Sequence, residues 1–146
     1  MAGTFSLDLA RFCKKYDANM HAVIRKIAFE TFKRVVLRTP VDTGRARANW
    51  GVRVGQPTTF TTEGVDKGGG KTLQAAMEGV NAWSADGSIF LTNNLSYILG
   101  LEYSDPGSKQ APAGMVRVTI AEMKAWIEAN AGKESIGDIR GKTGGY

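Results

Sequence analysis

The stretch Arg38-Thr-Pro-Val-Asp-Thr-Gly-Arg-Ala-Arg-Ala-Asn-Trp50 joins a basic segment with helical spacing to a segment with strand-like alternation. Pro40 has no amide proton and disfavours helical dihedrals at the residue before it, so the preceding helix should end there. Asp42 and Thr43 can accept hydrogen bonds from nearby backbone amides, and Gly44 adopts a positive φ at little cost. The stretch therefore predicts a structural turn, built by Pro40, Asp42, Thr43 and Gly44, that carries no catalytic chemistry.

Before this turn, residues 6–38 place apolar side chains at helical spacing, from Leu9 to Val36. Ser6 suits the N-cap of such a helix. Unbroken, the helix would be about 50 Å long at 1.5 Å per residue, longer than a compact domain of this size requires. We expect it either to break near residues 17–19, where Asp and Asn compete for backbone hydrogen bonds, or to project.

After the turn, residues 48–54 alternate apolar and polar side chains, which predicts a half-buried strand. Residues 58–63 are β-prone and are expected to return as a second strand. Residues 64–71 read as a glycine-containing loop, and residues 72–83 as a short helix with Leu73, Ala76, Met77 and Val80 on its apolar face. Residues 88–92 have the continuous apolar centre of a further strand.

The last third of the chain has one ambiguous and one clear element. Residues 97–103 fit either a short helix or a strand. Pro112 suits the first turn of a final helix that carries Val116, Ile120, Met123 and Ile127 on one face, although its beginning also alternates like a strand. The pattern as a whole predicts an α+β fold, in which a long N-terminal helix and a C-terminal helix pack on a small, mostly antiparallel sheet.

Length and composition favour one domain. The chain has 146 residues, of which 42% are hydrophobic and 23% charged, so we expect a single domain over residues 1–131 and a glycine-rich tail over residues 132–146. No apolar run reaches the roughly 20 residues that span a bilayer. With neither a membrane segment nor a secretory signal in the sequence, we expect maturation in the cytoplasm. The one cysteine, Cys13, cannot form an internal disulfide or a cysteine metal cluster.

The net charge of +5 is concentrated at the beginning of the chain. Residues 1–50 hold ten Lys or Arg and four Asp or Glu, which gives +6, whereas residues 51–146 hold nine and ten, which gives −1. A basic first helix can face DNA, where binding would fall steeply with salt, or an acidic protein neighbour, or simply solvent. The charge pattern alone leaves these three readings open.

The order Pro, Val, Asp, Thr, Gly, then basic residues and an aromatic, resembles the bacteriophage tail-completion or head-tail joining (neck) proteins, a family that includes the minor tail protein Z of phage lambda. A second segment is similar to the family's tyrosine, glutamate-glycine and alanine-proline order. It runs through Asn94-Leu-Ser-Tyr97, Leu101-Glu-Tyr103, Pro106-Gly107 and Gln110-Ala-Pro112, with the glycine displaced to four residues after Tyr103. Residues 56–85 do not align with the family pattern.

The resemblance implies a structural protein of the virion, made in the host cytoplasm, whose copies form a ring joining the head or its connector to the tail. Its partners would be copies of itself, neighbouring neck, connector and tail proteins, and DNA passing through the lumen, with no cofactor and no small-molecule substrate. For the subunit or partner contact we expect Arg45, Arg47, Trp50, Tyr97, Glu102 and Tyr103. A tail terminator ring is the nearest alternative, and a basic nucleic-acid-binding module is the alternative of another class.

Signals for enzymatic chemistry are weak. Gly70-Lys71-Thr72 ends like a phosphate-binding P-loop, but the position that needs the first glycine holds Val65. His21 is the only histidine, and no acidic cluster accompanies it, so no metal-ligand set is predicted. We therefore predict no catalytic, cofactor-binding or metal-binding residues and no enzymatic activity.

Overall fold

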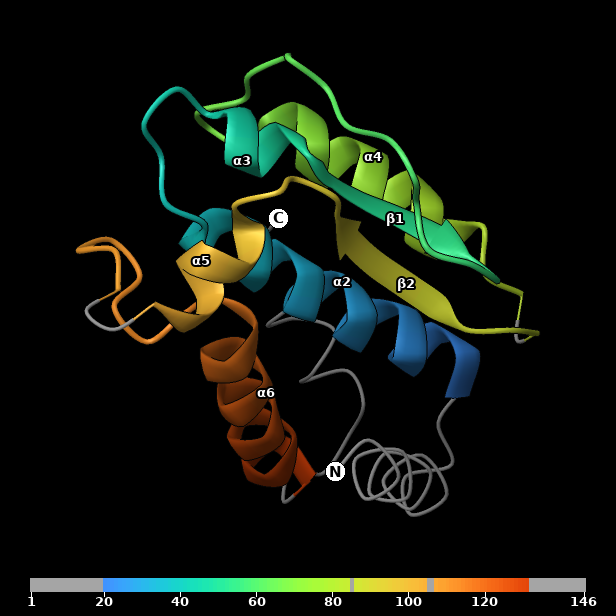
Figure 1. The fold of residues 1–146 in the computed structure, drawn as a ribbon. Coiled ribbons are helices and arrows are strands. Elements are labelled where there is room, and N and C mark those ends of the chain that lie inside the picture. The colour runs from blue at the N-terminus through green and yellow to red at the C-terminus, as the bar shows by residue number, and fades with distance from the viewer. Residues whose placement is uncertain (1–19, 85, 105–106, 132–146) are drawn as a thin grey trace.

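A computed structural model of the chain describes residues 20–84, 86–104 and 107–131. Its elements run in the order α2 (Met20–Arg38), α3 (Arg45–Ala48), β1 (Trp50–Val54), α4 (Gly70–Asn81), β2 (Ile89–Asn93), α5 (Ile98–Tyr103) and α6 (Val116–Ala131). Figure 1 shows the two strands side by side, with α2 along β2 and α5 and α6 gathered at one end of the sheet. The α+β class and the small antiparallel sheet predicted from the sequence are confirmed.

The sheet has two antiparallel strands in a register that separates its two faces. Trp50 lies opposite Asn93, Val52 opposite Leu91 and Arg53 opposite Phe90. Because side chains alternate along a strand, Trp50, Val52 and Val54 share the inner face, whereas Gly51 and Arg53 point to the outer face. The inner face carries the core, and the outer face is left to solvent and to the coil that follows β1.

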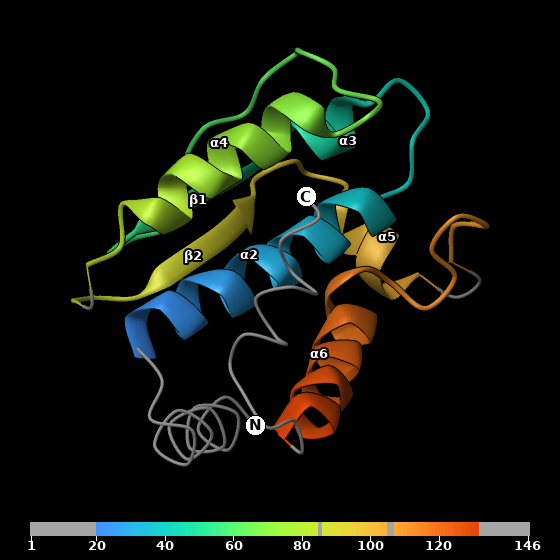
Figure 2. The same ribbon diagram turned by 180° about the vertical axis from the view of Figure 1, so that it is seen from behind.

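Two clusters of buried side chains lie on the inner face among the described residues. One lies between α2, α4 and the strands and contains Phe29, Ala76 and Val80, with Val52 and Ile89 packed against it. The other lies at the end of the sheet near α5 and contains, among others, Val35, Val36, Ala46, Trp50, Leu95, Ile98, Ala111 and Met115. Leu73 of α4 packs against both clusters, so α4 bridges them. Figure 2 shows α4 running along β1. The two clusters bring both halves of the chain onto α2.

α6 lies against α2 through charged and polar groups as well as apolar ones. Arg38 donates to the hydroxyl of Thr119 at 2.7 Å and to a carboxylate oxygen of Glu122 at 2.5 Å. Arg34 reaches both Glu122 and Glu30. This network fixes α6 across the C-terminal half of α2.

The strand prediction for residues 58–63 is wrong, and the one for residues 48–54 begins too early. Ala48 ends α3, and Asn49 is a turn residue, so the strand starts at Trp50. In residues 58–62, side-chain amides take the backbone groups that a ladder would use. Asn94 donates to the carbonyls of Thr58 and Phe60, and Asn49 pairs with both the N–H and the carbonyl of Thr62. The strand that pairs with β1 comes from residues 89–93 instead.

The helix predictions hold with shifted boundaries. Residues 97–103 resolve as helix, and α4 begins at Gly70 and ends at Asn81 rather than spanning 72–83. The alternation at the start of the last helix is misleading, because Val116 already lies in α6. Pro112, expected in the first turn of this helix, lies in a turn four residues before it. Ile120, expected on the buried face, is 51% exposed, and Thr119 takes the buried place. On α4, Met77 is exposed although Ala76 and Val80 are buried.

Several predictions concern residues outside the described ranges: the N-terminal part of the first helix, its break near 17–19, Cys13, and the tail from 132. Among the residues that the structure describes, no helix is both long and apolar enough to cross a membrane.

Gly79 lets α4 approach β1, and replacing it should destabilise the fold. A Cβ built on Gly79 would lie 2.9 Å from Val52 Cγ1 and 3.0 Å from the Val52 carbonyl oxygen. We predict that Gly79→Ala lowers the free energy of unfolding by about 1–3 kcal/mol through overpacking. Gly70→Ala is the matched control, because a Cβ there meets nothing within 4 Å. Urea denaturation measures both, and an unaltered Gly79→Ala would contradict the packing described.

Candidate functional site

Two segments that carry the resemblance, more than forty residues apart in sequence, meet at one hollow. It has a volume of about 320 Å³ and is lined by Pro40, Val41, Asp42, Thr43, Gly44, Arg45, Ala46, Tyr97, Leu101, Ser108 and Gln110. Gln110 connects two of its walls. Its side-chain amide accepts from the Val41 N–H at 2.8 Å and donates to the Val41 carbonyl at 2.9 Å. We call this feature the turn hollow, and it is the candidate functional site.

The turn itself forms largely as predicted. α2 ends at Arg38, two residues before Pro40, and Gly44 has a φ of 93°. Gly44 is also crowded, because a Cβ there would lie 2.6 Å from the backbone nitrogen of Lys67. The chain does not leave the turn directly as a strand, however. It makes one helical turn, α3, before β1.

The side chains of the turn do not all act as expected. The hydroxyl of Thr43 accepts a hydrogen bond from the Arg45 N–H at 3.2 Å, as predicted for an ST turn. The expected backbone hydrogen bond to Asp42 is not formed, and no hydrogen bond or ion pair ties the Asp42 carboxylate to the described part of the chain. Asp42 is exposed at the wall of the turn hollow.

Thr39, which has no exposed surface, ties the end of α2 to β1. Its hydroxyl donates to the Val35 carbonyl at 2.8 Å and accepts from the indole N–H of Trp50 at 2.8 Å. Its carbonyl accepts from Nε of Arg47 at 3.0 Å, and Arg47 also donates to the carbonyls of Leu37 and Lys67. Arg47 therefore caps the C-terminal end of α2, where free carbonyls need donors. We call Thr39, Arg47 and Trp50 the Thr39 lock.

The coil over residues 62–67 is held against the same turn. Arg45 donates to the Thr62 carbonyl and forms an ion pair with Glu63, and the Asp66 N–H donates to the Gly44 carbonyl at 3.0 Å. Asn49, also fully buried, pairs with Thr62. The coil over residues 62–67 is thus bound to the turn over residues 44–49.

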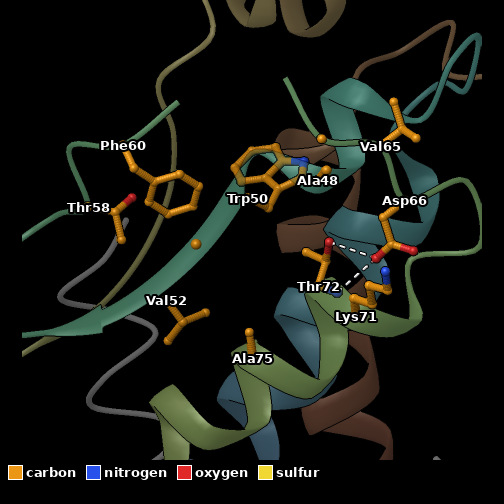
Figure 3. A pocket seen from close by; sticks show the side chains of 12 residues that line it. Ala48, Trp50, Val52, Thr58, Phe60, Val65, Asp66, Lys71, Thr72 and Ala75 are labelled. Carbon is orange, nitrogen blue, oxygen red and sulfur yellow. Dashed lines mark hydrogen bonds between the residues drawn. The ribbon is translucent and has the colours of Figure 1, made fainter. Parts of the chain in front are cut away.

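Asp66 occupies the position that a phosphate would take at the N-terminus of α4. Its carboxylate accepts from the N–H and the hydroxyl of Thr72 at 2.8 and 2.9 Å, and from the Gly69 N–H (Figure 3). Burial alone would raise the pKa of Asp66, but these hydrogen bonds outweigh it and lower the pKa below its ordinary value. The Gly70-Lys71-Thr72 sequence therefore forms a helix start capped by a carboxylate.

The hollow in Figure 3 lies beside this cap. It has a volume of about 380 Å³ and lies between β1, the coil after it and the first turns of α4. Trp50, Val52, Phe60, Val65 and Ala75 give it an apolar wall. In the described residues, no cluster of histidine, cysteine, aspartate or glutamate could hold a metal ion.

Glu102 caps the last helix. Its side chain is buried, and it accepts from the N–H groups of Met115, Val116 and Arg117 at 2.8 to 3.1 Å. The Arg117 guanidinium adds an ion pair at 3.0 Å and lies over the Tyr103 ring, 4.5 Å from its centroid. Burial would raise the pKa of Glu102, but the backbone and guanidinium hydrogen bonds outweigh it and lower the pKa.

The six residues expected at a subunit contact therefore divide into two groups. Arg47, Trp50 and Glu102 are engaged within the chain, and Arg45 is partly so. Tyr97 and Tyr103 are 43% and 60% exposed, and Leu99, between them on α5, is 66% exposed. The contact role of all six stays a prediction, and Tyr97, which also lines the turn hollow, is the one best placed for it.

Some residues that matter at the site carried no clear signal in the sequence. Thr39 looked like a residue that merely precedes proline, and Asn49 like the polar half of a strand alternation. Asp66 stood six residues before Thr72, too far for a standard capping pattern. Gln110 lies in the second of the two segments, 69 positions after Val41, and no sequence pattern indicates that these two residues form hydrogen bonds.

Comparison with known proteins gives no relative: no family model, no curated protein and no solved structure matches this chain.

The Thr39 lock predicts a large effect for a near-isosteric substitution. Thr39→Val removes the hydroxyl and leaves the buried indole N–H of Trp50 without an acceptor, so we expect a loss of about 1–3 kcal/mol of unfolding free energy. Thr59→Val, at an exposed coil position, is the matched control and should stay within about 0.5 kcal/mol of the wild type. Equal stability of the two variants in chemical denaturation would refute the lock.

The lowered pKa of Glu102 predicts acid sensitivity. Because the folded pKa lies below the ordinary value of 4.5, the unfolded state binds more protons, and the stabilisation present above pH 4.5 is lost as the pH falls below it. Glu102→Gln should be less stable at pH 7 and should lose less stability than the wild type between pH 5 and the acid limit. Thermal unfolding across this range measures both, and parallel pH profiles would count against the capping role.

Proposed function

We propose that this chain is a ring-forming structural subunit of the neck of a tailed bacteriophage, where it joins the head or its connector to the tail. The observation that carries the proposal is the turn hollow. The resemblance was read from two segments separated along the chain, and these two segments line one surface feature. A recognition surface made of both would account for their occurring together in one sequence.

The character of this surface supports assembly as its use. Tyr97, which is exposed and immediately precedes α5, lines the hollow, and Leu99 and Tyr103 are exposed on α5 itself. Tyrosines are enriched at protein interfaces because they offer a large apolar area together with a polar end. In a closed ring, every subunit uses the same two surfaces in head-to-tail contact, so one such surface must be matched by a second, different one.

The alternatives find less support. A tail terminator ring would use the same kind of surface and differs from the proposal only in its place in the particle. A nucleic-acid-binding module on the first helix would need free cations, but three of the five basic residues of α2, Arg25, Arg34 and Arg38, donate to groups of the chain itself. Hydrogen-bonded and ion-paired guanidinium groups are less available for phosphate contacts.

Locating the protein in intact particles tests the proposal directly. Antibody labelling or electron microscopy of particles of a phage that encodes the chain should place it in a ring at the head-tail junction. A position on the tail tube itself, as the last ring at its head-proximal end, would favour the terminator alternative. Particles that lack the protein altogether would contradict both.

The exposed tyrosines at the two ends of α5 predict an assembly defect without unfolding. Tyr97→Ala combined with Tyr103→Ala should reduce the yield of tailed particles at least tenfold, because these side chains would be lost from the centre of a contact. Ile120→Ala is the matched control, since Ile120 is 51% exposed on α6, away from the turn hollow. Complementation of a phage that lacks the gene measures both, with circular dichroism to verify folding. Arg47 is unsuitable for this test because its loss would release the end of α2.

A further inference from the structure

Arg53 differs from every other arginine that the structure describes. Six of the seven donate to carbonyls or carboxylates of the same chain: Arg25, Arg34, Arg38, Arg45, Arg47 and Arg117. The guanidinium of Arg53 has no such partner in the described residues, although it stands on a strand rather than on a loose loop. An arginine on a rigid element, exposed and unpaired, has its donors available to another molecule.

The surroundings of Arg53 are apolar. Phe90 lies directly opposite it on β2 and points to the same outer face. The Phe60 ring covers Gly51 on that face, within 2.6 to 3.0 Å of where a Cβ of Gly51 would lie, and is 43% exposed. An arginine opposite one phenylalanine, with a second phenylalanine on the same face of the sheet, resembles the centre of an interface, where arginine and aromatic side chains are enriched.

Asp42 is the complementary group. Of the acidic residues that the structure describes, Asp42, Glu78, Asp86 and Glu128 have no ion-pair or hydrogen-bond partner among the described residues. Asp42 alone of these four lines the turn hollow, together with the exposed ring of Tyr97 and the half-buried Leu101. A carboxylate beside an aromatic ring suits a guanidinium, which can pair with the one and stack on the other.

These two groups cannot pair within one subunit. The residues of the turn hollow come from the turn before α3, from α5 with the residue before it, and from residues 108–110. Arg53 is the fourth residue of β1, which runs away from α3 (Figure 1). Two complementary surfaces on different sides of one molecule are the arrangement that a head-to-tail contact requires.

We propose that the outer sheet face of one copy docks on the next copy, with Arg53 inserted into the turn hollow against Asp42 and Tyr97. The contact is heterologous, and its repetition closes the ring. This inference rests on the proposed function and deepens it by naming both surfaces of the subunit contact. The choice of a second copy as the docking partner rests on the charge complementarity between unpaired Arg53 and the unpaired carboxylate of Asp42 in the turn hollow.

Charge reversal tests the pairing. Asp42→Arg and Arg53→Asp should each weaken self-association at least tenfold in Kd, because each places like charges together. The double variant restores opposite charges in exchanged positions and should recover much of the wild-type affinity. Sedimentation velocity over a range of concentrations measures the association of all four proteins. Asp86→Arg and Lys124→Asp, also exposed but on neither surface, are the matched controls and should associate like the wild type.

The possible outcomes separate this contact from the proposed function. Weakened single variants and a recovered double variant support the pairing. Any of three results overturns it. The single variants associate like the wild type, the double variant associates no better than either single variant, or the wild type stays monomeric at every concentration. The proposed function is decided separately by the position of the wild-type protein in particles, which none of these charge changes affects.

Discussion

The hydroxyl of Thr39 accepts the indole proton of Trp50, and this buried hydrogen bond fixes where the first described helix ends relative to the sheet. A buried indole N–H without an acceptor is costly, so the helix terminus and the first residue of β1 must stay in register. Arg47 reinforces the same point by donating to two carbonyls at the end of α2. The turn between them, with Gly44 pressed against the backbone of residues 66–67, follows from this constraint.

The lock changes how the turn sequence is understood. Four residues of the turn sequence stabilise the fold of the single chain: Thr39, Arg47, Asn49 and Trp50. They cap α2 and hold the coil over residues 62–67 in place. Two features of the turn are not used by the Thr39 lock and remain available to other molecules. They are the carboxylate of Asp42 and the concave surface beside Tyr97. A rigid turn of this kind presents a recognition surface at little cost in conformational entropy when it binds.

Local sequence patterns predicted those helix ends, turns and elements that depend on residues close together in the chain. Pro40 and Gly44 gave the end of the helix and the left-handed position, and hydrophobic spacing gave α4, β2 and α6 to within a few residues. The failures come from tertiary contacts. Residues 58–63 have strand propensity, but the side chains of Asn49 and Asn94 take their backbone groups. Likewise, spacing could not reveal that Gln110 would pair with Val41 across the turn hollow, or that Glu102 would be used to cap α6.

Hydrogen exchange of the Trp50 indole proton, followed by NMR and assigned with a Trp50→Phe variant, measures the central constraint most directly. We predict that this proton is protected as strongly as the buried amides of α2, because it exchanges only when the end of the helix separates from the sheet. Exchange of the Trp50 indole proton at the rate of an exposed side chain, while the α2 amides remain protected, would show that the fold does not depend on this contact.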